Sequence, residues 1–428
     1  MVSRWGKMSL REAGVLLIDC VHKTPPASEI GYPYIAIPQL KNGRLDLSDV
    51  RCISREHFVE WTRKASPQTH DVILSRRCNP GETAFVPSGF EGALGQNLVL
   101  LRSDGQKVFL PFLRWLVRSP YWWEQVGTFI NVGAVFDSLK CADIPNFQLP
   151  IPPLDEQKAI AHILGTLDDK IELNQQMNQT LEAIARALFK SWFIDFDPVR
   201  AKLDGRQPAG MDAETAALFP AEFEDSALGK IPKGWKVGAL GEEFKITMGQ
   251  SPPGSTYNAI GDGLPFYQGR SDFGFRYPSL RVFCNAPTRF AETGDTLVSV
   301  RAPVGDINMA HQKCCIGRGV AAIRHKQGSR SYSYYSMRSL SEHFAKFEAE
   351  GTVFGAISKQ DFLKILYLVP PQNLVSKFEE LAYSLDQKVE IQEEQSFNLT
   401  SMRDALLPKL LSGEIRVQDA EKLVEAVT

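Results

Sequence analysis

The sequence predicts a mixed α+β protein with two globular α/β domains separated by a pair of long antiparallel, coiled-coil-like helices, related by pseudo-two-fold symmetry. The first observation behind this prediction is an internal repeat. Pro152-Pro153 recurs as Pro370-Pro371, 218 residues later, and the following segments stay aligned without a gap for about forty residues. A repeat of this length indicates two copies of one structural unit. The other two observations are helical spacing of apolar residues within the repeat and strand-rich segments before it.

Residues 1–150 and 235–369 are each predicted to fold as an irregular α/β domain. Short β-rich runs such as Val72–Leu74 alternate there with turn residues. One aromatic helix is expected in each block, over Phe109–Trp123 and Tyr332–Phe347. The two blocks resemble each other weakly, so they are expected to share a scaffold but differ in their loops. Because loops carry recognition, the two domains are expected to bind different features.

Residues 151–197 and 370–412 are predicted to form the long helices. Apolar residues recur there in steps of three and four, which is typical of helices that pack on other helices. About forty residues at about 1.5 Å each span roughly 60 Å, and such a helix needs its apolar face covered. We therefore expect the two copies to pack antiparallel with a domain at each end. The packing residues are expected to be Leu164, Leu167, Ile171, Leu181 and Leu188 in the first helix and Leu385, Val389, Leu399 and Leu406 in the second.

Polar residues interrupt both apolar stripes at equivalent positions, Asn174 and Asn178 in one copy and Gln392 and Ser396 in the other. Such residues can fix helix register and partner choice at a cost in stability. Alternatively, the stripe drifts off the contact face at these positions. The sequence leaves both interpretations open.

Two segments connect or follow these elements. Residues 198–234 are expected to connect the first helix to the second domain, and residues 413–428 to form a loosely held tail. An aromatic cluster that looks exposed, Trp192, Phe193 and Phe196, ends the first helix. We expect it to pack against the connector or the opposite domain, and a contact with a partner subunit is the alternative.

The composition, with 43% hydrophobic and 23% charged residues, is that of a globular protein. The sequence has neither an apolar stretch of membrane-spanning length nor a secretory signal pattern, which favours a cytoplasmic protein without a membrane partner. Seven scattered cysteines without a Cys-x-x-Cys pair argue against a disulfide framework and a zinc site, and no metal site is expected.

The net charge of −2 conceals alternating basic and acidic blocks. Residues 1–150 carry a net charge of +3, residues 151–234 carry −5, residues 235–369 carry +5 and residues 370–428 carry −5. A basic block suggests a polyanionic partner, and an acidic block suggests a protein partner or solvent. Because the alternation occurs in both halves, we expect two polyanion-binding domains.

The known catalytic motifs are missing from the sequence. It contains no phosphate loop, dinucleotide fingerprint, metalloprotease helix, nucleophile elbow or adenine-methylation motif. Acid-x-Lys triplets could indicate a nuclease metal site, but they lie in helical pattern, where such residues are ordinary surface residues. The triplets are Glu156/Lys158, Asp168/Lys170 and Asp386/Lys388. No catalytic residue is therefore expected, and the chain is predicted not to be an enzyme.

The repeated segments resemble a known family. Pro152–Gln157, the helix after it and Leu188–Arg200 closely resemble the central conserved region of the specificity subunits of type I restriction-modification systems. Leu406–Ile415 is similar to the end of that family's distal conserved region. The resemblance covers nearly the whole chain, in the family's order of variable domains and spacer helices. One departure is Pro371–Leu374, where the family pattern carries Leu-x-Glu-Gln, and it concerns only the start of the second helix.

This resemblance implies a non-catalytic subunit of an adenine-specific DNA methyltransferase and type I restriction endonuclease complex. Each variable domain would be a target-recognition domain that reads one half of a bipartite site in double-stranded DNA. Two modification subunits would bring S-adenosylmethionine, restriction subunits would add ATP- and Mg-dependent activity, and this chain would bind no cofactor itself. Half-sites on one duplex face recur every ~34 Å, which is of the same order as the roughly 60 Å helix.

Three loops in each half offer residues for DNA contact. Lys and Arg suit phosphate contacts, whereas Arg, Lys, Asn and Gln read base edges. The first half offers Gln39, Lys41, Asn42 and Arg44 in loop 1, Arg76 and Arg77 in loop 2, and Gln96 and Asn97 in loop 3. The second half offers Gln268, Arg270 and Ser271 in loop 1, Arg301 in loop 2, and Arg318 in loop 3. For any single arginine, a solvated or structural role is the alternative.

Three rival functions stay open at this point. A modification-only methyltransferase complex would keep the same subunit but lack restriction. A coiled-coil scaffold with two peptide- or glycan-binding domains would explain the duplication but not the charge alternation. A self-contained methyltransferase or nuclease would bind S-adenosylmethionine or cut DNA by itself. Salt-dependent DNA binding separates the scaffold from the others, because phosphate contacts release counterions.

Overall fold

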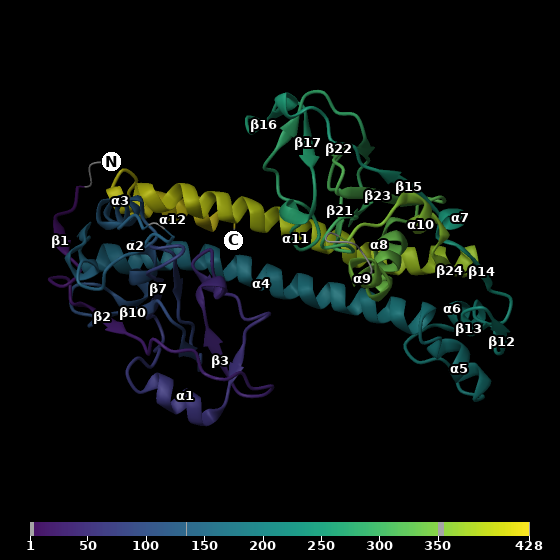
Figure 1. The fold of residues 1–428 in the computed structure, drawn as a ribbon, viewed down its shortest axis with the longest axis horizontal. Helices are drawn as coiled ribbons and strands as arrows, with labels where there is room; N and C mark the ends of the chain where they lie inside the picture. The colour runs from purple at the N-terminus through teal and green to yellow at the C-terminus, as the bar shows by residue number, and fades with distance from the viewer. Residues whose placement is uncertain (1–3, 134, 350–354, 428) are drawn as a thin grey trace. The chain divides into compact units, whose positions relative to one another are not determined.

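The structure, a computed structural model, describes residues 4–133, 135–349 and 355–427. The chain divides into unit 1, Met1–Leu173 with Gln395–Thr428, and unit 2, Asn174–Glu394. Two long helices, α4 (Leu154–Phe193) and α11 (Gln372–Ser412), contribute one half each to both units (Figure 1). The predicted mixed fold, with two long helices that pack together, is confirmed.

The central sheet of unit 1 has four antiparallel strands in the order β2-β10-β7-β8. Successive residues of a strand point to opposite faces. Val72 and Leu74 of β7 accordingly join the core beside α4, whereas Ile73 joins a second cluster on the other face. Because both faces of this sheet are covered, β7 and β10 are largely continuous runs of apolar residues. The strands are β2 (Val15–Asp19), β10 (Leu98–Ser103), β7 (Val72–Ser75) and β8 (Thr83–Phe85).

Smaller strand pairs complete unit 1. β3 (Tyr32–Ile35) lies between antiparallel β6 (Cys52–Ile53) and parallel β9 (Ala93–Leu94). Helix α1 (Arg55–Thr62) follows β6. The remaining pairs are β1 (Lys7–Ser9) with β11 (Gln148–Pro150) and β4 (Leu40–Lys41) with β5 (Arg44–Leu45).

Unit 2 repeats this topology. Its four-stranded sheet has the order β15-β23-β20-β21, and β17 pairs in parallel with β22 as β3 does with β9. The sheet strands are β15 (Phe244–Met248), β23 (Val320–His325), β20 (Thr296–Ser299) and β21 (Ile307–Met309). The others are β14 (Lys236–Ala239), β16 (Tyr257–Asn258), β17 (Leu264–Tyr267), β18 (Phe283–Cys284), β19 (Phe290–Ala291), β22 (Cys314–Ile316) and β24 (Leu366–Val369). The duplication therefore extends from the helices to the strand order of the domains.

The same ion pair stabilises both sheets. In unit 1 Arg102 donates to both carboxylate oxygens of Asp71, at 2.9 and 2.6 Å. In unit 2 Arg324 donates to both oxygens of Asp295, at 2.6 and 2.8 Å. Asp71 directly precedes β7, and Arg102 lies on β10, the strand paired with β7. Asp295 and Arg324 have the same places on β20 and β23, so the two units share this ion pair although their sequences have diverged.

The aromatic helix expected in each domain is interrupted. In unit 1 the segment forms α2 (Leu113–Leu116) and α3 (Pro120–Phe129), because Ser119 caps α3 and Pro120 starts it. In unit 2 the segment forms α8 (Arg330–Ser339) and α9 (Ser341–Ala349). Helix α8 packs on β20, β21 and β23 (Figure 1). Two further short helices of unit 2 are α7 (Leu240–Glu243) and α10 (Lys359–Lys364).

Helices α4 and α11 pack antiparallel within each unit. In unit 1 Leu164, Leu167 and Ile171 are buried in one cluster with Leu399 and Leu406. In unit 2, where Phe189 stacks edge-on against Phe378, the expected packing residue Val389 is buried. Leu181, Leu188 and Leu385 are half-buried. Helix α11 begins at Gln372, so the departure from the family pattern does not prevent the helix from forming.

The polar residues of the seam are not turned to solvent. Asn174 and Asn178 are each only 2% exposed. Asn174 Nδ2 donates to the backbone oxygen of Gln392 at 3.5 Å. Of the two interpretations left open above, this burial favours the one in which polar residues fix the register of the helix pair.

One sequence-based expectation is wrong. Residues after Gly413 do not form a loose tail, because α12 (Val417–Glu425) buries Ala420 and Val424 in the core of unit 1. Gly413, with φ of +74°, ends α11 in the left-handed conformation and lets the chain turn back. The four-residue spacing of Ala420 and Val424 marks one helix face, a signal too short to stand out in the sequence.

The aromatic cluster at the end of α4 packs inside unit 2. Trp192, Phe193 and Phe196 look exposed in the sequence but are buried, with Phe219 and Trp235 against them. The packing on the connector that we expected is present. The connector consists of α5 (Asp197–Leu203), α6 (Ala213–Ala217), β12 (Phe223–Ser226) and β13 (Gly229–Pro232). In the described part of the chain, every helix is too short or too polar to cross a membrane.

Candidate nucleic-acid interface

One groove of about 710 Å³ in unit 1 is lined by residues of predicted loops 1 and 3, whereas Arg76 and Arg77 of loop 2 are not among its lining residues. Gln39 of loop 1 and Gln96 of loop 3 line it, and Asn79 follows loop 2 into the same groove. Loops 2 and 3 are joined directly, because Arg76 N donates to Asn97 O at 2.9 Å. The fold thus brings together residues from three distant parts of the sequence. Arg51 also lines the groove and was not predicted.

Loop 1 of unit 1 contains a tight hairpin. Asn42 and Gly43 have φ of 52° and 80° between β4 and β5, the conformation of a type I′ turn, which Asn-Gly favours. On either side of this turn the basic side chains have protein partners. Lys41 Nζ lies 2.5 Å from Asp46, and Arg44 pairs with Glu172 and donates to Asp168 O at 3.0 Å. Arg44 therefore attaches the hairpin to α4, which is the structural alternative for this arginine.

The two arginines of loop 2 differ. Arg76 is half-buried, and its Nη1 donates to Leu139 O at 3.4 Å. Arg77 is exposed, and its guanidinium makes no hydrogen bond or ion pair with any residue that the structure describes. Asn97 of loop 3 adopts a left-handed φ of 68°, which asparagine tolerates better than most residues. Of these residues, Arg77 is the cation best placed to meet an external anion.

Unit 2 assembles its loops with equivalent contacts. Val300 N donates to Gly319 O at 2.9 Å, as Arg76 N does to Asn97 O, and Gly319 N donates to Gln268 O at 3.0 Å. Gln268, Arg270, Ser271, Arg301 and Arg318 are all exposed.

The exposed side chains of these loops have different partners. Arg270 pairs with Asp306 at 2.7 Å, and Ser271 Oγ accepts from Arg281 at 3.4 Å. The backbone N–H of Arg318 donates to Ser251 Oγ at 3.1 Å. Arg301 has no side-chain partner in the described ranges. Arg301 therefore matches Arg77 of unit 1 both in its position on the loop and in having a guanidinium without a partner among the described residues.

A buried aspartate at repeat-equivalent positions attaches each domain to the helices. Asp168 of α4 and Asp386 of α11 are each 1% exposed. Asp168 Oδ1 lies 2.6 Å from Arg403 Nη1, with Arg44 and Arg114 at 3.5 and 3.8 Å from Oδ2. These carboxylates are enclosed by arginines, so neither is presented as a metal ligand of a nuclease.

In unit 2 the arginine closest to the buried aspartate is Arg276, which comes from a loop of the domain. Arg276 is completely buried, and its Nη1 lies 2.6 Å from Asp386 while its Nη2 lies 3.3 Å from Glu182 of α4. The Tyr335 hydroxyl donates to Asp386 at 3.0 Å. Sequence reasoning missed Arg276, because a loop arginine looks the same whether it contacts DNA or a buried carboxylate. The one available signal was the recurrence of its partner aspartate in both repeats.

Two more carboxylates of α11 hold the same domain. Glu379 accepts from the backbone N–H groups of Arg330, Ser331 and Tyr332 at 2.9, 3.1 and 2.9 Å, and so caps α8. Glu393 accepts from Arg276 N and Tyr277 N, both at 3.3 Å. Burial raises the pKa of both glutamates, and the backbone hydrogen bonds oppose this shift. Since 379, 386 and 393 are seven residues apart, all three carboxylates lie on one face of α11.

One group of metal-type ligands lies close together in the described residues: Asp19, Cys20 and His22. His22 pairs with Asp19 at 2.9 Å, and the Cys20 thiol donates to Gly95 O at 3.2 Å. Burial raises the pKa of Cys20 to about 11, which disfavours the thiolate that binds metals. These side chains therefore provide no developed metal site.

The sequence of this chain is similar to those of several known proteins. Residues 20–183 match the family described as "Type I restriction modification DNA specificity domain". The MjaX specificity subunit of Methanocaldococcus jannaschii is 31% identical over 399 residues, 91% of this chain and 88% of that protein. The type I restriction enzyme HindI specificity subunit of Haemophilus influenzae is 30% identical over 429 residues, 85% of this chain and 90% of that protein. The chain belongs to the family of type I restriction enzyme specificity subunits.

The specificity subunit shares its fold with a solved relative. The crystal structure of a type I restriction-modification S subunit from M. genitalium covers 95% of this chain and 96% of its own, with a TM-score of 0.57 and 17% identity. At this identity the match shows the fold alone. The MjaX and HindI relatives confirm the family resemblance seen in the sequence, and the loop residues remain predictions.

Proposed function

We propose that this specificity subunit binds double-stranded DNA and reads a bipartite site, with one half-site for the loops of each unit. The observation that carries the proposal is the double assembly of the same three loops. Backbone bonds join loops 2 and 3 in both units, Arg76 to Asn97 and Val300 to Gly319. The side chains on these equivalent loops differ, which suits two different half-sites.

The available cations support this proposal. Arg77 and Arg301 occupy equivalent loops, are exposed, and have no side-chain partner among the described residues. An unpaired arginine can contact phosphate or the edge of guanine. The predicted amides Gln96 and Gln268 are exposed as well and can pair with base edges.

The helix pair supports a scaffolding role. We propose that α4 and α11 bind two modification subunits, with restriction subunits joining the complex, and that the specificity subunit itself has no catalytic activity. Exposed apolar side chains on the helices, among them Leu173 at 48% and Ile391 at 64%, occupy repeat-equivalent positions and suit equivalent partners. Adenine methylation with S-adenosylmethionine, and any ATP- and Mg-dependent cleavage, would belong to those partners.

Genome-wide mapping of methylated bases tests the proposal. The specificity subunit is co-expressed with its methyltransferase in a host that lacks other methyltransferases. We expect methylated adenines within one motif of two short halves separated by a gap of fixed length. A contiguous motif, or methylation that persists in a control strain expressing the methyltransferase without the specificity subunit, would contradict the proposed function.

A further inference from the structure

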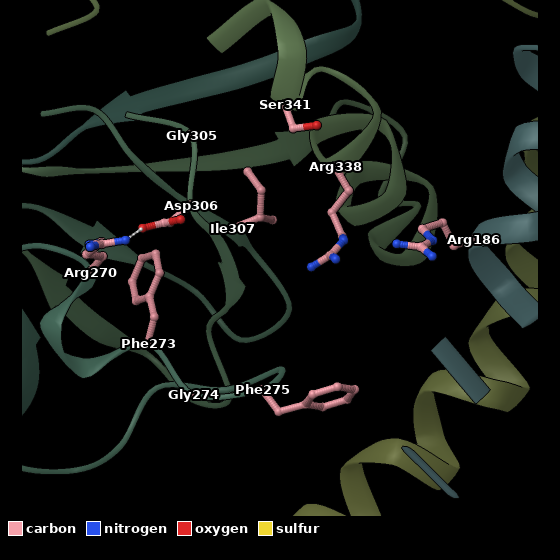
Figure 2. A pocket seen from close by; sticks show the side chains of 10 residues that line it. All are labelled: Arg186, Arg270, Phe273, Gly274, Phe275, Gly305, Asp306, Ile307, Arg338 and Ser341. Carbon is pink, nitrogen blue, oxygen red and sulfur yellow. Dashed lines mark hydrogen bonds and ion pairs between the residues drawn. The ribbon is translucent and has the colours of Figure 1, made fainter. Parts of the chain in front are cut away.

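Unit 2 contains a pocket of about 510 Å³ lined by three arginines (Figure 2). Arg186 comes from α4, Arg338 from α8, and Arg270 from loop 1. Phe273 and Phe275 form another part of the wall, and Ser341, the first residue of α9, lies at the edge. The pocket thus joins a predicted DNA-contacting loop to a long helix.

Two of the three arginines are already neutralised. Arg270 lies 2.7 Å from Asp306. Arg338 lies 3.2 Å from Glu182, which also pairs with Arg276 at 3.3 Å, and Arg338 donates to the Tyr334 hydroxyl at 3.3 Å.

Arg186 is exposed and makes neither a hydrogen bond nor an ion pair with any residue in the described part of the chain. Figure 2 shows its guanidinium pointing toward that of Arg338. The pocket therefore carries an uncompensated positive charge.

Unit 1 has the opposite charge at the equivalent position. The 218-residue offset places Asp404 where unit 2 has Arg186, and Asp404 lies 2.8 Å from Arg403. In unit 1 Arg118-Ser119 comes just after the end of α2, and in unit 2 Arg338-Ser339 forms the end of α8. Arg118 is therefore the counterpart of Arg338. Burial lowers the pKa of Arg118, and the charge of Asp404 opposes that shift. Unit 1 thus has a carboxylate, paired with Arg403, at the position where unit 2 has the unpaired Arg186.

We propose that the Arg186–Arg338 pocket binds a phosphate group of the DNA backbone next to the half-site read by unit 2. The inference rests on the proposed function. Arg186 supplies the uncompensated charge for the phosphate, and Arg338, which stays paired with Glu182, can donate a further N–H to another oxygen of the same phosphate. The first residue of α9 adds the positive end of a helix dipole at the pocket edge.

The backbone of bound DNA is favoured over a free nucleotide because Arg270 of loop 1 lies in the same wall. A strand held by this loop would have its phosphates close to the pocket. The contact would carry no sequence information, since phosphates are the same at every step. It would instead fix the register of the duplex on unit 2. Unit 1, with Asp404 in this place, would make no such contact.

The test compares Arg186→Ala with Lys190→Ala in the complete methyltransferase complex. Lys190 is a matched control, because it is an exposed cation one helical turn along α4 but pairs with Asp195. Fluorescence anisotropy measures affinity for the methylated motif and for unrelated DNA over a salt series. We expect Arg186→Ala to weaken both about three- to tenfold and to lower the slope of log K against log salt by about 0.9, the loss of one phosphate contact. Lys190→Ala should leave both values unchanged, and Arg186→Asp should weaken binding further.

Four outcomes would overturn the inference. The first is an unchanged affinity and slope for Arg186→Ala, and the second is an effect of Arg186→Ala on the cognate motif alone. Loss of the methyltransferase from the complex on size exclusion would show that a partner carboxylate occupies the pocket. Binding of inorganic phosphate or AMP to the complex, abolished by Arg186→Ala without loss of DNA affinity, would identify a free ligand. Failure of the wild-type complex to bind DNA would instead contradict the proposed function. Failure of the inference and failure of the proposed function can therefore be distinguished.

Discussion

Arg276 is a loop residue with no exposed surface, and its guanidinium is shared between Asp386 of α11 and Glu182 of α4. A buried charge is costly unless it is paired and hydrogen-bonded. Here the partners come from two separate helices, so the pairing is complete only when the domain loop is seated on both. At the residue scale, this network specifies how the domain of unit 2 attaches to the helix pair.

Replacing Arg276 by Met should destabilise unit 2 by about 3–5 kcal/mol, because Asp386 is left buried without its cation. Thermal unfolding of the full chain measures the change. Arg206→Ala is the control, since Arg206 and its partner Asp204 are 66% and 56% exposed and such pairs contribute at most about 1 kcal/mol. Adding Asp386→Leu should recover part of the loss. A loss for Arg276→Met no larger than that of the control would show that the network does not stabilise the fold.

We expect His325 to make the stability of unit 2 depend on pH. Burial lowers the pKa of His325 from its ordinary value of 6.5, and Glu243, 3.5 Å away, offsets part of this shift. The unfolded chain therefore binds a proton more readily than the folded one. The stability that this residue contributes is complete above pH 6.5 and is lost as the pH falls below that value.

We expect the unfolding midpoint of the wild-type chain to fall more between pH 7.5 and pH 5.5 than that of His325→Phe. The phenyl ring keeps the aromatic contacts with Phe244 and Tyr332 but cannot take up a proton. Carboxylates titrate in both proteins, so the difference between the two isolates the histidine. Parallel pH curves would mean that His325 is not the titrating group.

At the scale of elements, the helices are held by side chains from elsewhere in the chain. Glu379 of α11 caps the first N–H groups of α8, so the domain helix is completed by the long helix. In unit 1, helix α12 is likewise held by other elements, because its Ala420 and Val424 lie in the same core cluster as Leu407 and Leu411 of α11. Neither helix is stabilised mainly by its own propensity, which is typical of short helices.

Replacing Ala420 by Asp should detach α12, because the new carboxylate would be buried without a partner. We expect faster proteolysis of the C-terminal segment and a loss of more than about 2 kcal/mol in the stability of unit 1. Lys422→Asp introduces the same side chain on the exposed face and should change stability by less than about 0.5 kcal/mol. Equal proteolysis of both variants would contradict the docking of α12.

At the scale of the whole molecule, duplication gives two similar domains with independent loops. The shared scaffold includes the sheet order and the Arg102–Asp71 and Arg324–Asp295 pairs. The loops differ because they are free of these scaffold contacts. One chain can therefore carry two recognition surfaces that change separately.

Half-site independence is the resulting prediction. Arg77→Ala should weaken discrimination in one half of the motif and Arg301→Ala in the other, each by about five- to 150-fold at one position, the effect of about 1–3 kcal/mol per base contact. Competition binding with DNA altered in one half at a time measures this. A variant that weakens both halves equally would mean that its arginine contacts phosphate only or that the units are coupled.

Much of the fold could be predicted because the repeat and the apolar spacing are local patterns. Leu164, Leu167 and Val389 are buried as their three- and four-residue spacing predicts. The site was less predictable. Arg44 and Arg77 look alike in the sequence, yet one pairs with α4 and the other is available. Their difference depends on which carboxylates lie nearby in space.

The sequence by itself determined the duplication, the two long helices and the family, because ungapped repeats and helical periodicity are written along the chain. Only the tertiary structure decided that Arg276 is buried, that α12 is docked, and that Arg186 faces Arg338 where unit 1 has Asp404. The physical reason is that the energy of a charge depends on its surroundings. Those surroundings are assembled from residues more than a hundred positions apart, as with Arg276 and Asp386.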